Sequence, residues 1–191
     1  MLFRSAISVA VPSAWEFVLH DYQKRRVLTF LNPDTDALGA GWNITQAKIA
    51  LGSGGVAGKG FLLGTQSRLS FLPEKATDFI FTIVGEEFGF FGTMALLGLF
   101  AMVLFYGVRV ALASRNQFGR LLAMGITINF FLYIMINGMM VMGLIPVVGI
   151  PMPLLSYGGS AMMTVMLGFG LLMSVHVHRQ LDMPRHSAGV I

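Results

Sequence analysis

Residues 52–89 read GSGGVAGKGFLLGTQSRLSFLPEKATDFIFTIVGEEFG, and they join a glycine-rich, charged stretch to the start of a long apolar segment. Glycine lets the backbone adopt conformations closed to other residues and lets ligands approach closely. Charged groups at a membrane edge are costly, so they are usually retained for a function. The stretch therefore predicts a reactive site at a boundary between water and lipid.

The composition of the chain indicates a membrane protein. Of its 191 residues, 55% are hydrophobic and 12% are charged, whereas about a quarter are charged in soluble domains. Cysteine is absent from the sequence, which excludes disulfides, thiolate nucleophiles and zinc–thiolate sites. The net charge of +4 is mild, and its short clusters near the expected membrane edges favour lipid headgroups over nucleic acid.

The apolar segments predict three full spans and one partial span. The full spans lie at about 78–108, 121–145 and 156–177, and the partial span lies at 5–19. Residues 5–19 fall short of the roughly 20 residues that a spanning helix needs, so we expect the end of a helix, with a secretory signal as the alternative. Cations at 109–120 and in the tail 178–191 place both in the cytoplasm and the connection 20–76 outside.

The connection 20–76 opens with HDYQKRR, whose three consecutive cations either snorkel at the membrane surface or bind a ligand. The segment NPDTDALGAG at 32–41 predicts turns, since its two aspartates lack the spacing of an EF-hand calcium loop. WNITQAKIAL at 42–51 predicts a short helix in the membrane interface, anchored by Trp42.

The run GSGGVAGKG at 52–60 differs from a phosphate loop of the Walker type. Ser53 stands where the first glycine belongs, and Gly60 stands where Ser or Thr should follow Lys59. Free backbone N–H groups beside a lysine would still suit a ligand that carries phosphate.

Asp78 lies at the start of the first full span, where an aspartate either caps the helix or serves a functional site. With 3.6 residues per turn, Glu86 falls about a quarter-turn from Asp78 and Glu87 falls on the opposite face. Glu86 is therefore the better candidate for a neighbour of the site.

The segment GLIPVVGIPMPLLSYGGSAM at 143–162 contains three prolines, which stop or break helices. Irregular backbone at membrane depth persists only where it is buried in protein or lines a polar cavity. We therefore expect this segment to approach Asp78, while helix packing is the alternative for Gly158 and Gly159.

Three motifs in order, GTQSRLSFLPEKATDFIF (64–81), GEEFGFFG (85–92) and IPVVGIPMPLLSYGGSA (145–161), resemble the SEDS family (shape, elongation, division, sporulation) of bacterial membrane proteins. HDYQKRRV and QAKIALGSGGVAGKG are closer to the RodA-like elongation members than to the division members. The resemblance runs from about Glu16 to Arg179 and departs from the RodA-like pattern at Ala76, where a histidine is usual. It implies an all-α membrane protein, a polytopic helical bundle of which this chain is the last four of ten transmembrane helices plus a long external loop with short helices.

The resemblance implies a peptidoglycan glycosyltransferase that polymerises lipid II into glycan strands on the outer face of the bacterial cytoplasmic membrane during cell elongation. The strand linked to undecaprenyl pyrophosphate is the donor, and the 4-hydroxyl of lipid II is the acceptor. Asp78 matches the family's essential aspartate and is the candidate general base. The candidate substrate-binding residues are Lys59, Lys48, Gln46, Ser53, Gly58, Gln66, Glu74, Glu86, Ser156 and Ser160.

The implied partners are membrane lipid and a class B penicillin-binding protein. A divalent cation, Mg²⁺ or Mn²⁺, is a candidate helper with no assigned ligand set, although Asp78, Glu74 or Glu86 could contribute; no organic cofactor is expected. Two rival hypotheses stay open, a transporter that flips lipid II and a non-catalytic scaffold for the penicillin-binding protein. Residues 1–191 alone are expected to be inactive.

Overall fold

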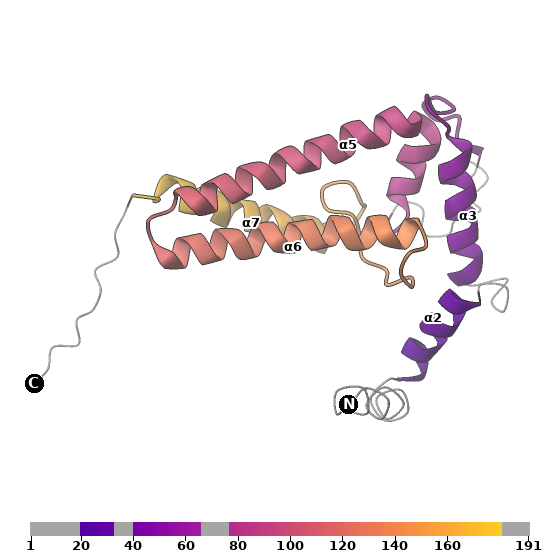
Figure 1. Ribbon diagram of the computed structural model, residues 1–191, viewed down its shortest axis with the longest axis horizontal. Coiled ribbons are helices and arrows are strands. Elements are labelled where there is room, and N and C mark those ends of the chain that lie inside the picture. Colours follow the sequence, from indigo (N-terminus) through magenta and orange to yellow (C-terminus); the bar gives the residue numbers. More distant parts are fainter. Residues whose placement is uncertain (1–19, 33–39, 66–76, 181–191) are drawn as a thin grey trace, which may run out of the picture.

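The computed structural model describes residues 20–32, 40–65 and 77–180, and they form helices without strands. The helices are α2 (Asp21–Leu31), α3 (Ala40–Ser53), α5 (Ile80–Ala113), α6 (Gln117–Val141) and α7 (Gly159–Val177) (Figure 1). The predicted all-α class is confirmed. The partial span expected at 5–19 lies outside the described residues.

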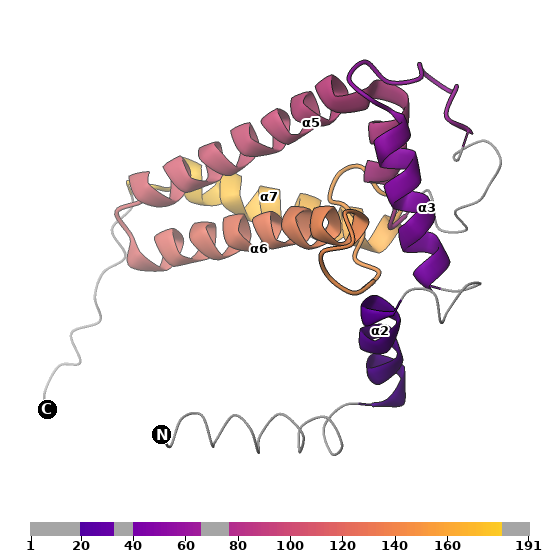
Figure 2. The same ribbon diagram turned by 45° about the vertical axis from the view of Figure 1, so that its right-hand side comes forward.

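Three of these helices, α5, α6 and α7, are long and apolar enough to cross a membrane. Figures 1 and 2 show them running side by side along the long axis of the molecule, while α3 stands across one end. The chain is therefore a polytopic helical membrane protein. The helix bounds differ from the predicted ones by a few residues, since α5 continues to Ala113 and α6 already begins at Gln117.

The connection before α5 contains α2 and α3, in agreement with the expected loop with short helices, although the residue pattern had placed only one of them, at 42–51. At the start of α2 the backbone N–H of His20 donates to Gln23 Oε1 at 3.1 Å, as in the second half of a capping box. In α3 the apolar residues Ile44, Ala47 and Ala50 are buried. Because α3 contacts both α5 and α6, it covers the end of the bundle.

The core of the bundle is aromatic. The ring of Phe130 lies 5.9 Å from that of Phe100 and 5.3 Å from that of Phe169, so one side chain joins α5, α6 and α7. Towards the C-terminal end of α5, Gly107 faces the hydroxyl of Thr127, and a Cβ on Gly107 would overlap that hydroxyl. Small residues at such crossings let two helices approach closely, as is usual between membrane helices.

Candidate functional site

The glycine loop, defined here as residues 54–60, fills a break in α5. Within α5 the backbone leaves helical geometry at Gly89, which has φ 65° and ψ −157°. In an unbroken helix the N–H groups of Phe90 and Phe91 would donate to the carbonyls of Glu86 and Glu87, four residues earlier. The break leaves all four of these groups without helical partners.

The glycine loop supplies a partner to each of the four. Lys59 N donates to the Glu86 carbonyl and Gly60 N to the Glu87 carbonyl, both at 3.0 Å. In return, Phe90 N donates to the carbonyl of residue 55 at 3.0 Å, and Phe91 N to that of residue 56 at 3.3 Å. The loop is thus joined to α5 by a reciprocal set of backbone hydrogen bonds.

Three of the backbone N–H groups that the sequence offered to a phosphate are engaged within the protein. The N–H of Gly58 donates to the Gly54 carbonyl at 2.9 Å, and those of Lys59 and Gly60 are bound to α5. Gly58 has φ +80°, and a Cβ on it would overlap the Glu87 carbonyl. A glycine is therefore required at this position for the close approach of the glycine loop to the backbone of α5.

Side chains reinforce the same junction. Lys59 Nζ lies 2.8 Å from Glu86 Oε1, and the hydroxyl of Thr65 lies 3.0 Å from that carboxylate oxygen and 2.9 Å from Nζ. The Glu86 side chain is 1% exposed and that of Lys59 is 28% exposed. The charge of Lys59 is therefore compensated by a buried carboxylate 27 residues later in the chain.

Asp78 lies just before α5 and is 8% exposed. The loop between α6 and α7, residues 142–158, is called the proline loop below and is drawn in orange in Figures 1 and 2. A Cβ on Gly149 of this loop would lie 3.2 Å from Asp78 Oδ2. The predicted approach of the proline loop to Asp78 is therefore observed.

Two polar side chains hold the proline loop against the start of α5. Asn137 Nδ2 donates to the backbone carbonyl of Asp78 at 2.9 Å and to that of Ile150 at 2.8 Å. The hydroxyl of Ser156 donates to the Thr77 carbonyl and accepts from Met152 N at 2.7 Å. Ser156, a predicted substrate-binding residue, thus contacts the backbone beside Asp78.

Arg26 of α2 also holds the proline loop. Its Nη1 donates to the carbonyls of Val147 and Val148 at 2.8 and 3.0 Å, and its guanidinium lies 5.2 Å from the ring centre of Tyr22. One member of the three-cation cluster therefore binds backbone carbonyls, a role that the sequence did not suggest.

The other predicted site residues differ in what they contact. The end of the Lys48 side chain passes over Gly143, where any Cβ would overlap it, so Lys48 borders the proline loop. Gln46 is buried in α3, while the exposed Ser53 donates to the Ala50 carbonyl of its own helix at 2.8 Å. Ser160 is exposed near the start of α7. Gln66 and Glu74 lie outside the described residues and stay predictions.

A divalent cation stays a prediction too. Within the ranges that the structure describes, no three His, Asp or Glu side chains gather closely enough to hold a metal. Glu86 contacts Lys59 instead, and Glu74, the third candidate ligand, is outside those ranges.

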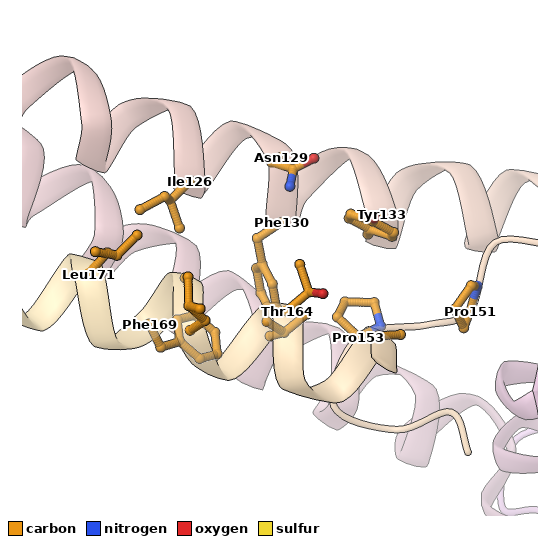
Figure 3. Close-up of a pocket in the computed structure, with 13 residues that line it drawn as sticks. Ile126, Asn129, Phe130, Tyr133, Pro151, Pro153, Thr164, Phe169 and Leu171 are labelled. Carbon is orange, nitrogen blue, oxygen red and sulfur yellow. The ribbon is translucent and has the colours of Figure 1, made fainter. Parts of the chain in front are cut away.

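A separate cavity of about 260 Å³ lies between α6 and α7 (Figure 3). Its walls are mainly apolar, with Asn129, Tyr133 and Thr164 as the polar members and Pro151 and Pro153 from the proline loop. None of the predicted site residues lines this cavity.

Sequence reasoning missed two side chains that organise the site, Asn137 and Thr65. Asn137 had a usable signal, because a lone amide inside an apolar span is costly and usually makes specific contacts. Thr65 had none, since its role depends on Lys59 and Glu86 meeting in space.

The fold and the site define a polytopic helical membrane protein with a buried carboxylate at one end of its bundle, under an ordered loop. The chain belongs to the FtsW/RodA/SpoVE family, because the model of that family, described as cell cycle protein, matches residues 1–181. This is the SEDS family that the motifs indicated.

Similar proteins include two named as peptidoglycan glycosyltransferases. The chain is 49% identical over 175 residues to MrdB of Escherichia coli K12, covering 92% of this chain and 47% of that protein. It is 45% identical over 162 residues to RodA of Treponema pallidum, covering 85% of this chain and 37% of that protein. The chain thus spans about half the length, or less, of these relatives.

Two solved structures are similar in fold. A chain from a study of how a peptidoglycan synthase complex coordinates polymerization and crosslinking superposes with a TM-score of 0.74 at 31% identity, covering 95% of this chain and 49% of that chain. A mutant of the rod shape determining protein RodA from Thermus thermophilus superposes with a TM-score of 0.56 at 28% identity, covering 82% of this chain and 54% of that one.

Proposed function

We propose that this chain carries the catalytic aspartate of a peptidoglycan glycosyltransferase that polymerises lipid II. The proposal depends chiefly on one observation, the buried position of Asp78 between the start of α5 and the proline loop. The names of the relatives support the reaction class. A carboxylate held at one end of a membrane bundle suits a substrate with a lipid tail and a sugar headgroup.

In the proposed reaction Asp78 accepts the proton of the 4-hydroxyl of an incoming lipid II. The oxygen forms a new bond to the anomeric carbon of the growing strand, and the bond from that carbon to the pyrophosphate breaks. Undecaprenyl pyrophosphate leaves with the electron pair. General-base catalysis of this kind contributes about 10²–10⁴-fold in typical enzymes.

The leaving pyrophosphate needs positive charge, and Lys48 is the better candidate of the two lysines. Lys59 is already paired with Glu86. Lys48 has no ion-pair partner among the described residues and borders the proline loop at Gly143, while Asp78 borders it at Gly149. A base and a cation that border the same loop suit the two ends of a glycosyl transfer.

We further propose that the site faces the outside of the bacterial cytoplasmic membrane, with the chain's C-terminus in the cytoplasm. The cations at 109–120 and after α7 support this orientation. A class B penicillin-binding protein is the proposed partner, supported by the similarity to a chain from a complex that combines polymerization with crosslinking.

The test uses a chain of the relatives' full length, completed if necessary with the N-terminal half of the E. coli relative. In detergent with lipid II, the unsubstituted protein is expected to form glycan polymer and Asp78→Asn to form none. The matched control is Asp21→Asn, since the Asp21 side chain is 96% exposed, and it should keep full activity.

Other outcomes would support one of the two rival hypotheses, a transporter or a scaffold. No polymer from the unsubstituted protein, together with movement of lipid II across vesicle membranes, would support a transporter. Normal growth of cells that carry only Asp78→Asn would support a scaffold.

A further inference from the structure

Asn137 hydrogen-bonds to both backbone segments around Asp78. It lies in α6, is fully buried, and donates both hydrogens of its amide nitrogen to backbone carbonyls. The acceptors belong to Asp78, 59 residues earlier, and to Ile150, 13 residues later. One amide therefore joins α6, the start of α5 and the proline loop.

The orientation of this amide is determined by its partners. Both carbonyls are acceptors, so they need the nitrogen and its two hydrogens. The opposite orientation would place Oδ1 against two carbonyl oxygens. In the observed orientation Oδ1 is buried with no hydrogen-bond partner among the described residues, a cost that native structures rarely retain without a reason.

The effect of this amide reaches the carboxylate of Asp78. The held carbonyl belongs to Ile150, and the preceding residue, Gly149, faces Asp78 Oδ2. On the other side of Gly149, Arg26 holds the carbonyls of Val147 and Val148. The short segment beside the carboxylate is thus fixed at both ends.

We infer that Asn137 is a positioning residue, which sets the distance and direction between the Asp78 carboxylate and the proline loop. It does not contact the substrate, and it acts through the Asp78 backbone and through the backbone at Ile150. The inference rests on the proposed function, because positioning has a catalytic consequence only if Asp78 is the base.

The main variant is Asn137→Leu, which keeps the approximate volume and removes both donors. Asn137→Asp keeps the shape but points a carboxyl at the same two carbonyls. Misplacing a reacting group by about 1 Å costs on the order of 100-fold in rate. We expect kcat for polymerisation to fall by about that factor in both variants, with KM for lipid II little changed.

The matched control is Asn129→Leu. Asn129 is also an asparagine of α6, eight residues before Asn137 in the sequence, but it is exposed and lines the apolar cavity of Figure 3. This variant makes the same chemical change without touching the backbone of Asp78 or Ile150. It should keep kcat and KM, with rates normalised to folded protein recovered by size exclusion.

A second readout reports the position of the proline loop itself. Residues 1–191 contain no cysteine. In a full-length protein without other cysteines, Met152→Cys therefore places a single thiol in the proline loop, at a buried position. A water-soluble maleimide should label this thiol slowly in the parent and at least tenfold faster with Asn137→Leu, while Asn129→Leu leaves the rate unchanged.

The two measurements separate the inference from the proposed function. If Asn137→Leu keeps both kcat and slow labelling while Asp78→Asn is inactive, the inference is wrong and the proposed function stands. If the unsubstituted protein forms no polymer, the proposed function fails, and labelling alone decides whether Asn137 holds the loop. A rise in KM for lipid II in Asn137→Leu without a fall in kcat would also overturn the inference.

Discussion

Removing the positive charge of Lys59 should detach the glycine loop from α5. In Lys59→Met the carboxylate of Glu86, 1% exposed, keeps Thr65 but loses the ammonium at 2.8 Å. Removing one partner of a buried ion pair costs about 3–5 kcal/mol. Because the Lys59 side chain keeps 28% exposure, we take the lower end, about 3 kcal/mol, which corresponds to roughly 150-fold in an opening equilibrium.

Hydrogen exchange measures this opening directly. The amides of Lys59, Gly60, Phe90 and Phe91 are the donors that join the loop to α5, so they exchange when the two separate. In the full-length protein in detergent, mass spectrometry of peptides covering these residues should show exchange faster by about two orders of magnitude in Lys59→Met. Peptides from α6 should not change.

Two further variants test the reasoning. Lys24→Met makes the same chemical change at a loose contact, 4.0 Å from the exposed Asp21, and exposed pairs contribute about 0–1 kcal/mol. Adding Glu86→Leu to Lys59→Met removes the buried charge and should restore most of the protection. Equal exchange rates in Lys59→Met and the parent, or no recovery of protection in the double variant, would refute the reasoning that Lys59 compensates the buried charge of Glu86.

Three other predictions concern backbone approach and loop position. Gly58→Ala forces a side chain onto a residue with φ +80° against the Glu87 carbonyl. We expect it to lower local stability by about 1–3 kcal/mol, measured by hydrogen exchange. Gly52→Ala, with open space around it, should be neutral. Gly107→Leu overpacks the contact of α5 with α6 and should lower stability in detergent by about 1–3 kcal/mol, seen as a lower melting temperature. Gly98→Leu, with nothing nearby, serves as the control. Equal melting temperatures of the two variants would contradict a close crossing of α5 and α6. Arg26→Gln removes charged hydrogen bonds to the proline loop and should cost about 1.5 kcal/mol, seen as faster proteolysis of that loop; unchanged cleavage would argue against the contact.

The sequence by itself determined the class of this protein. Apolar runs of about 20 residues have few structural solutions other than membrane helices, and α5, α6 and α7 follow from them. It also singled out Asp78 and the proline loop, because a carboxylate at a helix start and three prolines before a span are local features. Order and spacing along the chain were sufficient for these conclusions.

Only the tertiary structure decided which polar groups meet. Lys59 pairs with Glu86 across 27 residues, Asn137 with Asp78 across 59, and Arg26 with Val147 across 121. The helix period predicts which face a residue occupies, but it carries no information about which distant segment covers that face. The break at Gly89 is the clearest case. The N–H groups of Lys59 and Gly60 bind the two α5 carbonyls that the break deprives of helical donors, because each buried backbone donor or acceptor must find a partner.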